Sequence, residues 1–360
     1  MDVTREILGW NGAFEAHFGS LERPDWIAAR VIRQDKHGLT LQNEDGFWNG
    51  TVAGRLRKPG MDRAELPVVG DWVAGEPVPG EDKLFIQAVL PRKSKFSRKV
   101  PGKESREQVV AANMDILFLV TGLDHDYKPR RIERYVTLAW DSGATPVILL
   151  NKSDLRDDLD AIRDEVAQSA IGVDLHILSA LHGEGLDVVH QYLKPGVTIA
   201  FLGSSGVGKS TLINALLGED VMRTNAVRED DSRGRHTTTH RELFLFPGGG
   251  MLIDTPGLRE IQLWADEDSL DEAFADIAEL ALTCRFADCA HESEPGCRVK
   301  AALESGELSE KRYHSYLKLK KEIEFIRLRS EARVFEERQK QREFAKMVKT
   351  VMSTHPKKNR

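Results

Sequence analysis

The stretch Gly203-Ser204-Ser205-Gly206-Val207-Gly208-Lys209-Ser210 decides the fold class of this chain. It follows the apolar run 197–202 and precedes the apolar, helix-forming run 211–217. A glycine-rich loop between a strand and a helix lets backbone N–H groups surround phosphate oxygens. A chance glycine-rich turn is the alternative, but all eight residues match in the required context. The stretch predicts a phosphate-binding loop in an α/β domain, with Lys209 reaching the β- and γ-phosphates and Thr211 as a further nucleotide contact.

A second polar stretch, Asn151-Lys152-Ser153-Asp154, directly follows the apolar run 145–150. Asp154 can accept hydrogen bonds from the ring N–H and the exocyclic amine of guanine, whereas adenine offers no matching donors. An unpaired buried carboxylate would reject the wrong base by a factor on the order of 10⁴. Lys152 can lie along the face of the base, and Asn151 is expected to connect this stretch to the phosphate loop. The whole stretch, Ser153 included, therefore predicts selectivity for guanine nucleotides.

The same residue types are also favoured at a helix N-cap, which is the structural alternative for 151–154. Ser179-Ala180 follows the apolar run 175–178, where a further guanine-contacting loop is expected, and favours the nucleotide interpretation.

The order of the motifs along the chain is unusual, because this guanine element precedes the phosphate loop at 203–210, the reverse of ordinary GTPases. A pocket needs its strand-end loops to be neighbours in space, not in sequence. The order therefore predicts a circularly permuted GTPase.

The stretch Asp254-Thr255-Pro256-Gly257 ends the apolar run 251–253 and predicts a second phosphate-side element. Asp254 would help to hold Mg²⁺ from a strand end, while Ser210 of the phosphate loop would be a direct ligand. The N–H of Gly257 could approach the γ-phosphate closely, because glycine has no Cβ. Asp-Thr-Pro-Gly is also an ordinary turn sequence, so this tetrapeptide indicates a phosphate-side element only in combination with the other nucleotide motifs.

The polar segment 218–240 contains Arg233-Gly234-Arg235-His236-Thr237-Thr238-Thr239-His240. Its composition suits a segment that becomes ordered around the γ-phosphate and Mg²⁺. We expect Thr238 to ligate Mg²⁺, with Thr237 as the second choice. The alternative is that the threonines simply begin the edge strand that contains 243–246.

Leu258 follows Gly257, where many GTPases carry a glutamine that orients the attacking water. An aliphatic side chain cannot orient water. The sequence therefore predicts slow intrinsic hydrolysis, together with an activator or a substitute side chain such as His236. The alternative for His236 is a local packing or capping role.

All three cysteines of the chain lie in one short segment that also contains a histidine: Cys284, Cys289, His291 and Cys297. An odd number of clustered cysteines argues against a disulfide framework and for a metal site. Three thiolates and an imidazole form a closed tetrahedral Zn²⁺ site with no open position for substrate, so we expect a structural role. Three unrelated buried thiols are the alternative. His182 and His240 lack ligand spacing.

The N-terminal part consists of short alternating runs broken by turn residues, at 26–32, 39–42, 50–54, 71–75 and 83–90. About five such strands predict a small Greek-key barrel of the OB type, a fold that often binds RNA. Basic residues follow it at Arg92, Lys93, Lys95, Arg98, Lys99 and Lys103. They could follow a phosphate backbone while Phe96 stacks on a base, or they could form a solvated linker.

The formal net charge of -6 does not exclude an RNA partner, because the charges are segregated along the chain. Acidic residues are dense at 154–164 and 260–276, whereas basic residues gather after the barrel and within 311–360. The region 311–360 has a helical pattern, and its basic end at 357–360 is either an RNA contact or a disordered tail. With 360 residues and 41% hydrophobic content, the chain is long enough for two or three packed domains.

The permuted motif order, the segment 233–240 and the cysteine cluster together resemble the bacterial RsgA/YjeQ family of GTPases that depend on the small ribosomal subunit. The resemblance extends from the predicted barrel to the cysteine cluster. It implies a GTPase that binds the small subunit and its rRNA late in assembly, is stimulated by the subunit, and leaves after hydrolysis. It also implies GTP or GDP, Mg²⁺ and one structural Zn²⁺ on the four cluster residues.

We therefore predict three domains: an N-terminal extension with an RNA-binding barrel (1–101), a circularly permuted GTPase domain (102–264) and a zinc-binding, mainly helical domain (265–360). The N-terminal residues lack a signal-peptide pattern and no apolar stretch is long enough to span a membrane, so we expect a cytoplasmic location. Nothing demands more than a monomer. Two alternative functions are a translation-factor-like GTPase on mature ribosomes and an RNA-binding scaffold that holds GTP as a structural ligand.

Overall fold

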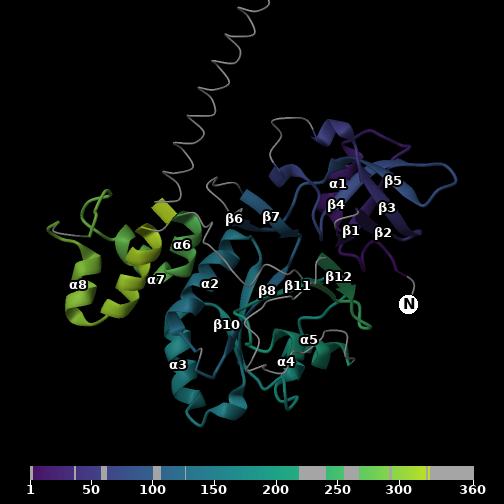
Figure 1. The fold of residues 1–360 in the computed structure, drawn as a ribbon. Coiled ribbons are helices and arrows are strands. Elements are labelled where there is room, and N and C mark those ends of the chain that lie inside the picture. Colours follow the sequence, from purple (N-terminus) through teal and green to yellow (C-terminus); the bar gives the residue numbers. More distant parts are fainter. Residues whose placement is uncertain are drawn as a thin grey trace, which may run out of the picture.

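The computed structural model describes residues 3–35, 38–57, 63–99, 107–125, 127–218, 241–254, 267–291, 294–321 and 323–324. A β-rich N-terminal part lies on one side of a central α/β part, and helices from the C-terminal part lie on its other side (Figure 1). This arrangement confirms the predicted fold class of barrel, α/β domain and helical C-terminal region. The boundaries proposed for the three domains stay predictions.

The N-terminal part is a closed barrel of five strands: β1 (Ile27–Gln34), β2 (Leu39–Asn43), β3 (Gly46–Val52), β4 (Trp72–Pro77) and β5 (Lys83–Val89). Hydrogen bonds join β1 to β2, β2 to β3, β3 to β5, β5 to β4, and β4 back to β1. Short 3-10 helices at Gly54–Arg57 and Arg63–Glu65 lie between β3 and β4. Helix α1 (Gly12–Gly19) packs on the barrel through Phe14, and Trp10, just before the helix, meets buried Trp72 edge to face.

The third barrel strand differs from the expected 50–54, because β3 already begins at Gly46. Asn43 and Gly46 are paired across a two-residue turn. The side-chain oxygen of Asn43 accepts hydrogen bonds from the Asp45 N–H and from Nε1 of Trp48. Gly46 adopts a φ of 133°, which favours glycine. This tight hairpin starts the strand four residues earlier than its hydrophobic pattern suggested.

The central sheet contains β8 (Ile116–Gly122), β9 (Thr145–Asn151), β10 (Asp174–Ile177), β11 (Thr198–Leu202), β12 (Arg241–Leu245) and β13 (Met251–Asp254). Their order is β10-β9-β8-β11-β13-β12, with β12 antiparallel to its neighbour and the other pairs parallel. The strand order changes direction between β8 and β11. Ligands of open α/β sheets bind at the carboxyl ends of strands beside such a change.

Helices cover both faces of this sheet: α2 (Pro129–Asp141), α3 (Leu159–Ser169), α4 (Leu186–His190) and α5 (Lys209–Leu217) (Figure 1). Alternate side chains of β8 explain why both faces are covered. Leu117 and Leu119 pack in the same core cluster as apolar residues of α2 and α3. Phe118 and Val120 belong to the cluster that contains apolar residues of α4 and α5. A strand buried on both faces is expected to be continuously apolar, as β8 is over residues 116–120.

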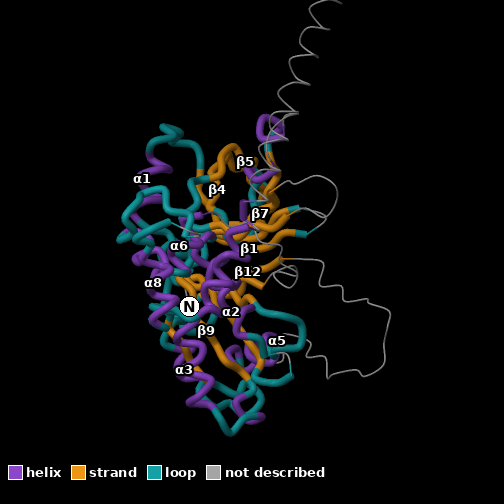
Figure 2. Tube along the Cα trace, turned by 90° about the vertical axis from the view of Figure 1, so that its left-hand side faces the viewer, coloured by secondary structure: helices purple, strands orange, loops and turns teal. Residues whose placement is uncertain are grey.

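The barrel and the central sheet are joined by main-chain hydrogen bonds between β1 and β12, which lie next to each other in two views that differ by 90° (Figures 1 and 2). Arg30 of β1 is 1% exposed and lies at this junction. Its guanidinium donates to the carbonyl oxygens of Leu8, Gly70 and Asn113 and to the hydroxyl of Thr198. These bonds hold the N-terminal segment, the barrel and the start of β11 together.

A two-stranded ribbon of β6 (Lys95–Lys99) and β7 (Glu107–Ala112) follows the barrel. The predicted base-stacking role of Phe96 is wrong for this arrangement, because its side chain is only 1% exposed. Three of the neighbouring basic residues are used in internal ion pairs, Arg92 with Asp71, Lys93 with Asp115, and Lys95 with Glu107. Burying the apolar Phe96 ring lowers the free energy of the folded protein, so this side chain packs in the core. The run of basic residues around Phe96 did not indicate this burial.

The C-terminal part contains α6 (Glu267–Ala273), α7 (Ala275–Leu282), α8 (Arg298–Ser305) and helical residues 310–321. Arg312 fixes it to the central domain. Its guanidinium binds both carboxylate oxygens of Asp276, the Ser169 carbonyl oxygen of α3, and lies 3.8 Å from the Glu133 carboxylate of α2. Burial raises the pKa of Glu133, an effect that Arg312 opposes. None of the helices among the described residues is long and apolar enough to cross a membrane.

Candidate nucleotide-binding site and metal cluster

The predicted phosphate loop lies between β11 and α5, in the strand, loop and helix arrangement expected for it. A Cβ on Gly203 would lie 2.3 Å from the Val120 carbonyl oxygen, and one on Gly208 would lie 2.3 Å from Nδ2 of Asn151. Gly208 also has a φ of 96°, which disfavours other residues. Lys209 Nζ donates to the carbonyl oxygens of Gly203 and Ser204. The loop thus has the tight backbone geometry that a phosphate cradle requires.

Asn151 connects three strand-end loops. Its Nδ2 donates to the Val207 carbonyl oxygen at 2.8 Å, and its Oδ1 accepts from the Ala180 N–H at 2.9 Å. The Asn151 side chain therefore forms hydrogen bonds to two other loops. As a helix cap it would instead bond to the backbone N–H groups of the helix that follows it. A short 3-10 helix does follow, at Ser153–Leu155, and its N-cap position belongs to Lys152 without a side-chain cap bond.

Lys152 has a positive φ of 66° and turns its side chain toward the phosphate loop. Its Nζ donates to the Gly206 carbonyl oxygen at 2.7 Å and to Oδ2 of Asp124 at 2.5 Å. Asp124 lies just beyond the end of β8, and sequence analysis missed it. The sequence did contain a signal, because Asp124 comes two residues after the apolar strand β8, and residues that follow parallel strands lie at the ligand-binding edge of the sheet.

Asp154 lies within reach of the loop that follows β10. Its Oδ1 accepts a 2.5 Å hydrogen bond from Ser179 Oγ, and its Oδ2 lies 3.9 Å from Nε2 of His182. His182 therefore belongs to the surroundings of the predicted guanine site and not to the cysteine cluster. Ser179 and Ala180 are buried, and the Asp154 side chain is 21% exposed. The residues expected to contact the base are thus brought together by the ends of β9 and β10.

Only some of the remaining predicted site residues lie in the described part of the chain. Ser210 and Thr211 are in the first turn of α5, and Asp254 ends β13, which pairs directly with β11. Five residues with expected roles lie outside the described part of the chain: His236, Thr237, Thr238, Gly257 and Leu258. Their roles in Mg²⁺ binding, γ-phosphate sensing and water positioning stay predictions.

The phosphate loop also contacts a residue that sequence analysis did not single out. Nη1 of Arg131, in the first turn of α2, donates to Ser204 Oγ at 2.9 Å. Arg131 and Ser204 are 73 residues apart in sequence. No local motif marks this arginine, because its neighbours Arg130 and Arg134 have the same charge.

The predicted metal residues form one cluster, in which the ligand atoms of Cys284, Cys289, His291 and Cys297 all lie within 4.8 Å of one another. Nδ1 of His291 lies 3.7 Å from the Cys284 sulfur and 3.4 Å from the Cys297 sulfur. Ligands about 2.0–2.3 Å from a tetrahedral Zn²⁺ would be separated by similar distances. Backbone N–H groups of Arg298 and Lys300, at the start of α8, donate to the Cys284 and Cys297 sulfurs. The donor set and its spacing fit Zn²⁺.

The comparison with known proteins agrees with this geometry. A family model described as RsgA GTPase matches residues 89–264. The small ribosomal subunit biogenesis GTPase RsgA 1 of Oceanobacillus iheyensis is 44% identical over 315 residues, which cover 87% of this chain and 90% of that relative. The chain belongs to the RsgA GTPase family. It is therefore a GTP hydrolase.

Other RsgA proteins match over almost the whole chain. The small ribosomal subunit biogenesis GTPase RsgA 2 of Vibrio parahaemolyticus is 43% identical over 351 residues, which cover 98% of this chain and 93% of that relative. The crystal structure of YjeQ from Thermotoga maritima is 28% identical with a TM-score of 0.62, and the match covers 83% of this chain and 98% of that one.

YloQ, described as a circularly permuted GTPase, has the same fold. It is 23% identical with a TM-score of 0.61, over 83% of this chain and 95% of that one. The match confirms the permuted fold that the motif order predicted. In this chain the loops after β8, β9, β10 and β11 meet at one sheet edge, so the pocket does not depend on the order of the motifs along the chain.

Proposed function

We propose that this protein binds the small ribosomal subunit and its rRNA during late assembly, hydrolyses GTP when the subunit stimulates it, and leaves after hydrolysis. The main support is 43% identity, across 98% of the chain, to a relative named as a small ribosomal subunit biogenesis GTPase. The five-stranded barrel supports an RNA partner, because barrels of this type often bind RNA. We place the protein in the cytoplasm, as a monomer.

In this proposal the described loops bind the guanine nucleotide. Asp154 accepts hydrogen bonds from guanine, and Lys152 lies along the base, held by its bonds to Gly206 and Asp124. Asn151 keeps the base loop and the phosphate loop in register through its bonds to Val207 and Ala180. The other nucleotide contacts come from Ser153, Ser179, Ala180, the loop 203–210 and Thr211.

Hydrolysis joins a water oxygen to the γ-phosphorus and breaks the bond to the bridging oxygen, which leaves with GDP. Lys209 stabilises charge on the β- and γ-phosphates. Ser210, Thr238 and Asp254 would hold Mg²⁺, which supplies further charge neutralisation when bound. Gly257 senses the γ-phosphate and His236 orients water in place of the glutamine that Leu258 replaces. The segment 218–240 loses its γ-phosphate contacts after hydrolysis, and this loss weakens binding to the subunit.

The cysteine cluster supports a structural Zn²⁺. Cys284, Cys289, His291 and Cys297 would hold one ion in a closed site, with the α8 backbone N–H groups stabilising the thiolates. The ion would cross-link the segment 284–297 to the start of α8. Its contribution is to folding of the C-terminal part and not to the chemical step.

The test is GTP hydrolysis by the purified protein with and without stoichiometric small ribosomal subunits. Large subunits, whole ribosomes and ATP are controls, and the Lys209→Ala variant should lose turnover. We expect a large rise that is specific to small subunits and to GTP. Equal stimulation by whole ribosomes would favour a factor that acts on mature ribosomes.

A second measurement tests release. Affinity for small subunits is compared in GDP and in a non-hydrolysable GTP analogue, and we expect tighter binding with the analogue. Equal affinities would contradict the release step. If hydrolysis were not stimulated and Lys209→Ala bound RNA and left the subunit normally, GTP would be a structural ligand of an RNA-binding scaffold.

A further inference from the structure

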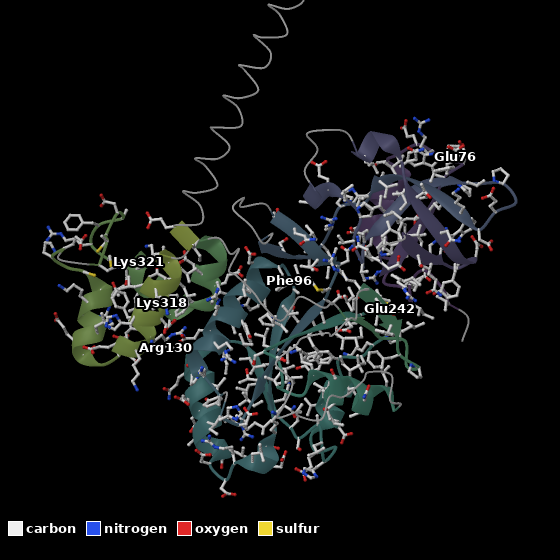
Figure 3. All side chains as sticks on the ribbon, in the orientation of Figure 1. Glu76, Phe96, Arg130, Glu242, Lys318 and Lys321 are labelled. Carbon is white, nitrogen blue, oxygen red and sulfur yellow. The ribbon has the colours of Figure 1, made fainter. Side chains whose placement is uncertain are left out.

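Arg131 contacts the phosphate loop from a separate helix. It is in the first turn of α2, the helix that follows β8 at the change of strand direction. Its Nη1 donates to Ser204 Oγ at 2.9 Å and its side chain is half-buried. The adjacent Arg130 is exposed, lies on the part of α2 that borders the C-terminal helices, and interacts electrostatically with Glu133 (Figure 3).

Lys209 identifies which end of the phosphate loop Arg131 approaches. The lysine of such a loop reaches the β- and γ-phosphates. Here Lys209 Nζ donates to the Ser204 carbonyl oxygen at 2.6 Å. Arg131 bonds the hydroxyl of this same residue. Two cations from different elements therefore converge on Ser204, at the γ-phosphate end of the loop.

The chemistry of the reaction requires positive charge at this place. Phosphoryl transfer spreads negative charge over the γ-phosphate oxygens and the leaving oxygen, and an arginine supplied by the same chain can stabilise this charge. Leu258 cannot contribute the amide contact that a glutamine would make at its position. A guanidinium has five N–H donors in a planar fork, so one arginine side chain can bond a protein oxygen and a phosphate oxygen together.

We propose that Arg131 is a catalytic residue that binds the γ-phosphate of GTP and stabilises the charge that develops during hydrolysis. This inference rests on the phosphate-loop assignment in the proposed function. Arg131 transfers no proton in this step. Its positive charge and its hydrogen bonds stabilise and orient the γ-phosphate, while a water oxygen attacks the γ-phosphorus and GDP leaves with the bridging oxygen. GDP lacks the group that Arg131 binds, so the residue should distinguish GTP from GDP.

The experiment compares Arg131→Ala, Arg131→Lys and Arg130→Ala with the unmodified protein, all without ribosomal subunits. Single-turnover GTP hydrolysis measures the chemical step, and equilibrium binding of GDP and of a non-hydrolysable GTP analogue measures affinity. Arg130→Ala is the matched control, because it removes the same charge from the same helix turn. Since no subunit is present, a failure of subunit stimulation would contradict only the proposed function.

We expect Arg131→Ala to reduce single-turnover hydrolysis roughly 10²-fold, the loss typical of one charge-stabilising donor. Affinity for the GTP analogue should fall while GDP affinity is retained. Arg131→Lys should recover part of the rate, and Arg130→Ala should behave like the unmodified protein. An unchanged hydrolysis rate in Arg131→Ala would overturn the proposal. So would an equal loss of GDP and analogue affinity, because that pattern belongs to an arginine that only supports the loop through Ser204.

Discussion

The side-chain amide of Asn151 donates a 2.8 Å hydrogen bond to the carbonyl oxygen of Val207, across 56 residues of sequence. This bond joins the predicted guanine loop to the phosphate loop. The same side chain accepts a bond from the Ala180 N–H, so it also joins the loop after β10. Because Asn151 is 2% exposed, both bonds are protected from water.

Replacing Asn151 with alanine should weaken binding of GTP and GDP together. The change leaves a buried carbonyl and a buried N–H without this partner, at a cost of about 2 kcal/mol or roughly 30-fold in affinity. Equilibrium binding of fluorescent GDP measures the effect. Asn49→Ala, on an exposed position of β3, is the control. If Asn151→Ala bound GDP like the unmodified protein, the link between the loops would be unnecessary for binding.

Asp124→Asn should increase the dissociation rate of both nucleotides. Asp124 pairs with Lys152 Nζ at 2.5 Å, and both side chains are partly exposed, so we expect a loss of only about 1 kcal/mol, or roughly fivefold in affinity. Stopped-flow release of labelled GDP measures it. Asp160→Asn, on the surface of α3, removes a carboxylate of 95% exposure and is the control. Identical release from Asp124→Asn and the control would show that Asp124 does not position Lys152.

Cys289→Ser should remove bound zinc from the protein. The unmodified chain should contain about one Zn²⁺, because three sulfurs and one imidazole complete a tetrahedral set. Metal analysis after dialysis measures the content, and hydrogen exchange measures the expected loosening of α7 and α8. Guanine nucleotide affinity should be retained, and His182→Ala should keep its zinc. Full zinc content in Cys289→Ser would exclude this cysteine as a ligand.

Arg30→Met should destabilise the junction between the barrel and the central sheet. Burial lowers the pKa of Arg30 to about 10, which still leaves it charged at neutral pH. Its removal leaves buried carbonyl groups at Leu8, Gly70 and Asn113 without this donor. We expect a loss of about 3–5 kcal/mol in unfolding free energy, measured by urea denaturation. Arg33→Met is the control, since that side chain is 43% exposed; an equal effect of both variants would contradict a special role for Arg30.

The arrangement of the barrel, the permuted GTPase sheet and the cysteine cluster could be predicted because each has a local signature. The loop 203–210 needs glycines at fixed spacing so that the backbone can approach a phosphate. The segment 284–297 places four ligand side chains within a short length of chain. The third barrel strand was placed too late, because a two-residue turn at 44–45 overrides the hydrophobic pattern.

The sequence by itself determined the kind of nucleotide site, the permuted order of its parts and the residues of the metal cluster. Only the tertiary structure decided that Asp124 holds Lys152, that Arg131 reaches Ser204, that Phe96 is buried and that β1 pairs with β12. The physical reason is the range of the interactions. Motifs reflect geometry imposed on neighbouring residues, whereas these contacts arise when packing of the sheet and its helices brings distant segments together.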